Sequence, residues 1–228
     1  MATNGGPNII EDGLVFAVDA ANKKSYPGSG TTWTDLAGSN NGTLTNGPTF
    51  NSGNGGNIVF DGSDDYVALT TLNPTSNNAF TYSLWVRPTS NSSDGSLIGN
   101  WTTPNPFLTY YDVGGTYPNY RSLVRMTDNS SAATSVNTNN ATLNQWSYVT
   151  TSFNSTSLKL YVDGSLVETV SSGLDPLSST GGCAIGAEDS AGGRHFSGNI
   201  ATCDLYDRVL TASEVLQNYN ALKGRFGL

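Results

Sequence analysis

The sequence predicts one all-β sandwich domain over residues 1–228, with its core at about 13–210 and one short helix at about 211–223. Short apolar alternations separated by turn residues recur along the chain, which is typical of β-sandwiches. Charged residues make up only 12% of the chain, and Gly, Ser, Thr and Asn replace them. A length of 228 residues suits one large sandwich, and because no internal repeat or linker is visible, we predict one domain.

The first half of the chain contains five predicted strands. A long Gly/Ser/Thr/Asn stretch over 23–57 interrupts them, and only weak strand signals occur in it. Pro88 ends the longest strand because proline lacks a backbone donor. The predicted strands cover residues 14–18, 42–44, 57–60, 66–69 and 80–87.

The second half contains the clearest hairpin signal. Asp163-Gly164 separates two alternating apolar runs, at 158–162 and 166–170, and a type I′ turn there needs positive φ at both residues. A further strand over 146–153 precedes the hairpin. The remaining predicted strands cover 97–100, 107–113, 121–126, 132–136, 183–185 and 200–205.

The end of the chain is predicted to be helical. Thr211 and Glu214 have the spacing of a capping box, in which each side chain satisfies the other's backbone donor. Gly224 is placed to end the helix. The residues predicted to share its apolar face are Val215, Leu216, Tyr219 and Leu222.

Two cysteines, Cys183 and Cys203, lie in apolar strand patterns. Two are too few for a disulfide scaffold, so we predict buried free thiols, with a strand-to-strand disulfide as the alternative. Two thiols and the single histidine do not form a zinc set.

The charge pattern excludes several classes of partner. Net charge is −8, and the ten basic residues are scattered, so the chain lacks the clustered Lys/Arg face that nucleic acids or anionic membranes require. No apolar run approaches the ~20 residues of a membrane span. No signal peptide is visible, so we expect the protein to stay where it is made, in the cytoplasm, or to leave by assembly into a particle.

The residues do not predict an enzyme. Retaining glycosidases need two carboxylates about 5 Å apart, which one strand supplies from alternate positions. No such segment occurs in the sequence, whose four glutamates are Glu11, Glu168, Glu188 and Glu214. Glu188 and Asp189 are adjacent, so on a strand they would point to opposite faces. His195 lies in a loop, where it is either a solvated side chain or a polar contact at a binding rim. We therefore predict no catalytic residues.

Two groups of residues are candidates for binding. Asp61, Asp64 and Asp65 offer three carboxylates in five residues, which predicts either a Ca²⁺ site or a turn whose side chains bond to its own backbone. Aromatic residues of the central loops form either a platform for stacking a glycan or a packing interface. These aromatic candidates are Trp101, Tyr110, Tyr111, Tyr117 and Tyr120, with His195 beside them.

Several ordered motifs resemble the LamG-like members of the concanavalin A-like lectin/glucanase superfamily. They are Phe60-Asp-Gly-Ser-Asp-Asp-Tyr-Val67, residues 80–88 with Trp85, Trp146 followed by Leu160-Tyr-Val-Asp-Gly164, Ile185-Gly-Ala187, residues 196–200 and residues 205–211. The resemblance implies a two-sheet antiparallel jelly roll, in agreement with the predicted strands.

The two ends carry a narrower resemblance, to stand-alone LamG-like proteins of bacteriophages. Residues 13–28 and 217–228 are similar to segments of such proteins. This resemblance implies a non-catalytic structural protein on the virion surface, in a head decoration, fibre or tail, with other virion proteins as partners. The alternative is an adhesin that binds host-surface glycans, and a glycan hydrolase is a third hypothesis. A homo-oligomer is compatible with each.

Overall fold

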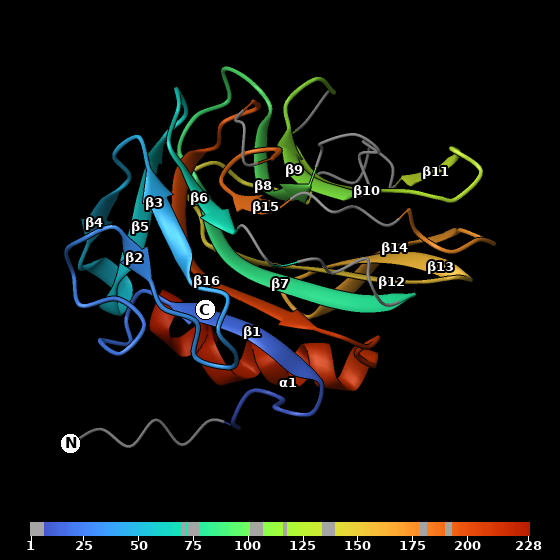
Figure 1. Ribbon diagram of the computed structural model, residues 1–228, viewed down its shortest axis with the longest axis horizontal. Coiled ribbons are helices and arrows are strands. Elements are labelled where there is room, and N and C mark those ends of the chain that lie inside the picture. Colours follow the sequence, from blue (N-terminus) through green and yellow to red (C-terminus); the bar gives the residue numbers. More distant parts are fainter. Residues whose placement is uncertain are drawn as a thin grey trace.

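The computed structural model shows a two-layer antiparallel β-sandwich with one α-helix against its outside (Figure 1). It describes residues 7–69, 72, 78–100, 107–115, 118–133, 140–177, 182–189 and 193–228. The predicted fold class is confirmed. No helix in these segments is long and apolar enough to cross a bilayer.

The first sheet, sheet A, is built around its longest strands. β1 (Leu14–Asp19) pairs with one end of β16, beside the part that pairs with β5. In spatial order the others are β14 (Ser165–Ser171), β13 (Ser157–Val162), β12 (Ser147–Asn154), β7 (Ala79–Pro88), β16 (Ser197–Tyr206), β5 (Asn57–Asp61) and β4 (Thr49–Asn51).

The second sheet, sheet B, faces sheet A across the core and is made of shorter strands (Figure 1). In spatial order they are β11 (Ser131–Ala133), β10 (Asn119–Arg125), β9 (Phe107–Asp112), β8 (Gly95–Asn100), β15 (Cys183–Ile185), β6 (Tyr66–Leu69), β3 (Gly42–Thr45) and β2 (Thr32–Trp33). The sequence missed β2 and β4, because strands of two or three residues are too short to show an alternation.

The core combines stacked rings with a small polar network. The rings of Phe80 and Phe153 lie 5.6 Å apart, and those of Tyr82 and Phe107 lie 5.4 Å apart. The Tyr82 hydroxyl lies 2.8 Å from Thr109 Oγ1, which also contacts hydroxyls of Ser122 and Thr151. These bonds join the two sheets, and they satisfy hydroxyls that would otherwise be costly to bury. Both cysteines are buried free thiols, as predicted.

The predicted hairpin is confirmed. Asp163 and Gly164 have φ of 51° and 77°, the positive values of a type I′ turn, and they connect β13 directly to β14. Asp163 also accepts a hydrogen bond from the backbone of Tyr148, 2.8 Å away, which ties the turn to β12.

The terminal helix α1 (Ala212–Leu222) begins with the predicted capping box of Thr211 and Glu214. Arg208 adds an ion pair of 2.7 Å to Glu214. The predicted apolar face is wrong in one position: Leu216 is 45% exposed, whereas Asn218 is fully buried. Asn218 donates to the Tyr206 hydroxyl and accepts from the backbone of Ile10, so the face is partly polar.

The α-helix ends at Leu222, within one residue of the predicted end, but Gly224 does not stop the chain from turning. It lies inside a 3₁₀ turn, η3 (Lys223–Phe226), and the left-handed residue that ends this turn is Gly227, with φ of 78°. The extra turn carries Phe226 onto the outer face of sheet A, where its ring lies 4.1 Å from that of Trp85. The gain from this aromatic contact accounts for the continuation past Gly224.

A carboxyl group is buried on the outer face of β16. Asp204 is 5% exposed, opposite Ser83 of β7 and Ala17 of β1. Burial raises the pKa of Asp204 to about 8, and the negative charge of Asp19 adds to the effect. The carboxyl is therefore protonated in the folded protein at neutral pH.

We expect Asp204→Asn to change how stability depends on pH. The unfolded carboxyl ionises near pH ~3.9, so the folded state holds an extra proton up to about pH 8, and wild-type stability falls as pH rises across this window. The variant should lack this fall, which amounts to at most ~1.4 kcal/mol per pH unit. Urea unfolding at several pH values measures it. The exposed Asp207→Asn is the control, and identical pH profiles for wild type and Asp204→Asn would contradict the prediction.

Candidate functional site

Four loops meet at one end of sheet B, and we call this region the loop end. It comprises residues 61–65, 89–96, 110–115 with the facing Arg121, and 186–189 with 193–196. Asp94 accepts a hydrogen bond from the backbone of Val113, and the backbone N–H of Ser96 donates one to the Arg194 carbonyl. The Asp65 carbonyl lies 3.4 Å from His195 Nδ1. Contacts between segments far apart in sequence therefore fix this region, which lies at the upper side of the sandwich (Figure 1).

Tyr110 lies at the centre of the polar surface of the loop end. Residues 107, 109 and 111 of β9 face the core, so Tyr110 faces outward. Arg121 is the cross-strand partner of Tyr110 on β10, and its guanidinium carbon lies 5.6 Å from the centroid of the Tyr110 ring. The guanidinium carbon of Arg194 lies 5.4 Å from the same centroid. Both distances fit cation–π contacts. The ring is only 7% exposed, and its burial raises the pKa of the hydroxyl.

Carboxylates hold both guanidinium groups in place. Arg121 pairs with Asp112 at 3.0 Å. Arg194 pairs with Glu188 at 3.3 Å and reaches Asp94 at 3.9 Å. Burial raises the pKa of Glu188, while the positive charge of Arg194 opposes that rise. The Arg194 side chain is 45% exposed, so it is the part of this array most open to a ligand.

The backbone around Arg194 has an unusual conformation. Gly193 and Arg194 have φ of 110° and 43°, and positive φ is uncommon for a residue other than glycine. A Cβ at position 193 would collide with the Glu188 carboxylate, so glycine leaves the room that the ion pair of Glu188 with Arg194 needs. Such strained residues gather at functional sites.

A buried hydroxyl lies next to Tyr110. Ser96 is the cross-strand partner of Tyr110 on β8, so its side chain lies on the same face of sheet B. Ser96 is fully buried, and its Oγ has no hydrogen-bond partner within the described part of the chain. A buried hydroxyl without a partner is costly, so Ser96 is an unusual feature of this face.

The structure separates the aromatic residues that the sequence grouped together. Tyr111 and Tyr120 face the core and are 1% and 0% exposed, so the prediction of an exposed platform is wrong for them. Tyr110 faces outward from sheet B, but Arg121 and Arg194 cover its ring. Trp101 and Tyr117 lie outside the described residues. His195 is half-buried: its Nε2 accepts a hydrogen bond from the Gly193 N–H, its Nδ1 lies 3.4 Å from the Asp65 carbonyl, and its ring lies 6.4 Å from that of Tyr66.

The 61–65 loop forms the turn that the sequence allowed. Asp61 accepts a hydrogen bond from the backbone of Ser63 at 2.7 Å, and Asp65 accepts one from the backbone of Asp61 at 3.0 Å. The same loop brings carboxylate oxygens of Asp61, Asp64 and Asp65 within 4.8 Å of one another. Ca²⁺ takes about six to eight oxygens, so other donors would have to complete its shell. The backbone bonds account for Asp61 and Asp65 without an ion.

Asp65→Ala is expected to lower the free energy of unfolding by about 1–2 kcal/mol in calcium-free buffer, because it removes a side chain that is only 5% exposed and takes away the acceptor of the Asp61 N–H. Asp64→Ala, which removes an exposed carboxylate of the same loop, should change it by less than ~0.5 kcal/mol. Denaturant unfolding with and without Ca²⁺ tests this. A loss that occurs only when Ca²⁺ is present, and in both variants, would show an ion site instead.

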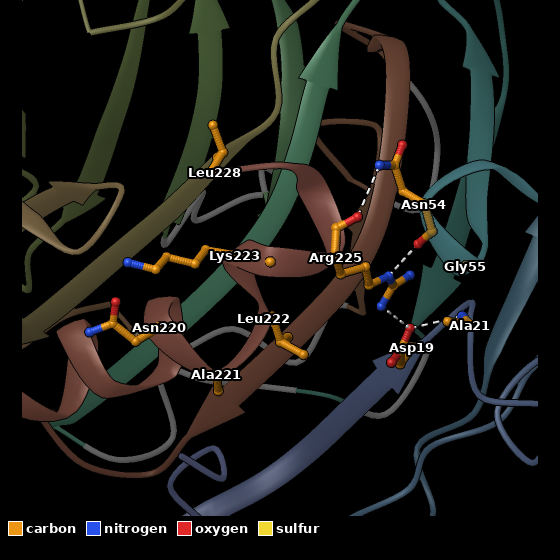
Figure 2. A pocket seen from close by; sticks show the side chains of 11 residues that line it. Asp19, Ala21, Asn54, Gly55, Asn220, Ala221, Leu222, Lys223, Arg225 and Leu228 are labelled. Carbon is orange, nitrogen blue, oxygen red and sulfur yellow. Dashed lines mark hydrogen bonds and ion pairs between the residues drawn. The ribbon is translucent and has the colours of Figure 1, made fainter. Parts of the chain in front are cut away.

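A separate pocket of about 670 Å³ lies at the end of α1 (Figure 2). Arg225 closes one side: it pairs with Asp19 at 2.8 Å and donates to the carbonyls of Asn54 and Gly56. The lining contains no aromatic side chain. Its residues are Asp19, Ala21, Asn54, Gly55, Leu228 and 220–225. Because the loop end joins an aromatic ring, two guanidinium groups and their paired carboxylates in one array, we take it as the candidate functional site.

Comparison with solved structures shows the fold. The binding domain of Paraclostridial mosquitocidal protein 1 matches with a TM-score of 0.73 and 18% identity, over 92% of this chain and 52% of that one. Trypanosoma rangeli sialidase matches with 0.68 and 17%, over 93% and 33%. Domain 4 of AbnA, an extracellular arabinanase from Geobacillus stearothermophilus solved with arabinotriose, matches with 0.67 and 18%, over 90% and 98%.

The chain thus spans about half of the toxin domain and nearly all of the arabinanase domain. No curated protein sequence matched it. The family model of the concanavalin A-like lectin/glucanases superfamily matches residues 61–216, which is more than half of the chain. This match covers the turn at 61–65, the hairpin and the entry to α1, so the chain belongs to the concanavalin A-like lectin/glucanase superfamily.

Proposed function

We propose that this protein is a non-catalytic glycan-binding module that binds its ligand at the loop end. The observation that carries the proposal is the contact of the Tyr110 ring with the guanidinium groups of Arg121 and Arg194, each of which is held by carboxylates. A sugar hydroxyl both donates and accepts hydrogen bonds. It can therefore accept from a guanidinium and donate to the neighbouring carboxylate, which suits a ligand rich in hydroxyl groups.

The structural neighbours support a binding role for the fold. One of them is a single domain that was solved with arabinotriose, and it aligns over 98% of its length. Another is the binding domain of a mosquitocidal toxin. The identities of 18% show the fold alone, so the proposal depends on the side chains at the loop end.

The arrangement of carboxylates supports a role without catalysis. A retaining glycosidase needs a free nucleophile and an acid about 5–5.5 Å apart. At the loop end, Asp112 is paired with Arg121, and Glu188 and Asp94 are paired with Arg194. Elsewhere, Glu214 serves the cap of α1. Each of these carboxylates therefore has a structural partner.

Arg194→Ala is expected to weaken glycan binding at least tenfold, because it removes the most exposed donor of the array and a charged hydrogen bond is worth about 1.5–3 kcal/mol. A glycan array identifies the ligand, and titration calorimetry measures the Kd of wild type and variant. Arg87→Ala is the matched control, because Arg87 lies on β7 of sheet A and its Nε donates to the Asn144 carbonyl.

Equal binding by wild type and Arg194→Ala would place the site elsewhere. Absence of binding to every glycan would contradict the proposal. Release of reducing sugar from a bound glycan, lost in Glu188→Gln, would show a hydrolase instead of a binding module.

For the context of the module, we propose display on a virion surface. The support is the resemblance of residues 13–28 and 217–228 to bacteriophage proteins, together with their packing, since Arg225 pairs with Asp19. Both segments contribute to the lining of the pocket in Figure 2, which contains no residue of the loop end. The surface around this pocket is suited to anchoring while the loop end remains open.

The virion proposal predicts that the chain copurifies with particles. Particles made by the source of the gene are banded on a density gradient and analysed by quantitative mass spectrometry. We expect the chain in the particle band, in fixed ratio to the major virion proteins at successive purification steps. Recovery only in the soluble fraction would contradict the virion role and leave the glycan-binding proposal intact.

A further inference from the structure

The loop end carries an excess of negative charge. Within the described residues its acidic side chains number seven and its arginines two, in a chain whose whole net charge is −8. The acidic residues are Asp61, Asp64, Asp65, Asp94, Asp112, Glu188 and Asp189. Like charges within about a Debye length, ~8–10 Å, repel an approaching anion.

The two arginines do not offset this excess for a ligand. Arg121 is paired with Asp112, and Arg194 with Glu188 and Asp94. An incoming carboxylate or sulfate would compete with protein carboxylates for the same guanidinium protons. Separating the existing pairs would leave Glu188, whose side chain is only 22% exposed, without its cation, which is costly.

The groups left for a ligand are mainly acceptors. The carboxylate oxygens accept hydrogen bonds only, because an ionised carboxylate carries no proton. A carboxylate or sulfate has no proton to donate to them, whereas a sugar hydroxyl does. The array therefore matches a ligand whose hydroxyl groups donate to carboxylates and receive from the exposed part of Arg194.

We infer that the loop end selects uncharged glycans and rejects glycans that carry carboxylate or sulfate groups. The inference rests on the proposed glycan-binding function and goes beyond it by naming the ligand class. The ion pairs that hold Arg121 and Arg194 beside Tyr110 are the same groups that exclude an anionic sugar. The selectivity is thus part of the architecture of the site.

The test uses pairs of immobilised oligosaccharides that are identical except for a terminal sialic acid, and a neutral arabinan beside a polygalacturonate. Binding of the full chain is measured at low and at physiological salt. We expect at least tenfold tighter binding to the neutral member of each pair, with the ratio shrinking as salt rises because added ions screen the repulsion.

A double variant, Asp94→Asn with Glu188→Gln, removes two negative charges while keeping the shapes of the side chains. We expect it to narrow the neutral-to-anionic ratio at least threefold. The matched control, Glu11→Gln with Asp207→Asn, removes two exposed charges outside the loop end and should leave the ratio unchanged.

The outcomes separate the two proposals. Equal or tighter binding to the sialylated or uronate member would overturn the inference while the glycan-binding function stands. A neutral preference that the double variant does not alter would also overturn it, because the loop-end charges would not be its cause. Absence of binding to every glycan would overturn the proposed function and this inference together.

Discussion

The whole sandwich depends on the pairing of β16. One edge of this strand pairs with β7 along its length, and the other is divided between β5, at residues 197–200, and β1, at residues 202–206. A bulge between Ile200 and Thr202 separates the two halves. A bulge increases local twist, so one strand can serve two partners that diverge. The first strand of the chain, the central strands and the last strand are thereby joined in one sheet.

The same strand positions the two functional ends of the molecule. Just before β16, Arg194 and His195 enter the loop end; just after it, Arg208 leads into the cap of α1. The helix in turn covers the outer face of sheet A, which leaves the polar outer face of sheet B as the one that carries Tyr110 and its ion pairs (Figure 1). The placement of the candidate site therefore follows from the strand order.

Local patterns in the sequence predicted the local structure well. Asp163-Gly164 and the Thr211–Glu214 box specify their turn and cap by backbone geometry alone, so both were readable. The candidate site was not, because Tyr110 meets Arg121 through strand register and Arg194 through a loop 84 positions away in the sequence. Nothing in the composition of β9 distinguishes the outward Tyr110 from the inward Tyr111, and only the register of the sheet decides between them.

Burial of Tyr110 beneath two arginines is compatible with recognition. Side chains held by ion pairs on paired strands lose little further freedom when a ligand arrives, and such preorganisation favours affinity. Arg121 stands on β10 and Asp112 at the end of β9, so their geometry is set by the ladder and not by a flexible loop. A ligand that lies across the ion pairs beside Tyr110 would meet guanidinium donors and carboxylate acceptors in alternation. Recognition would then depend on hydrogen bonds to these polar groups, while the rigid tyrosine ring packs against both guanidinium groups and keeps them in place.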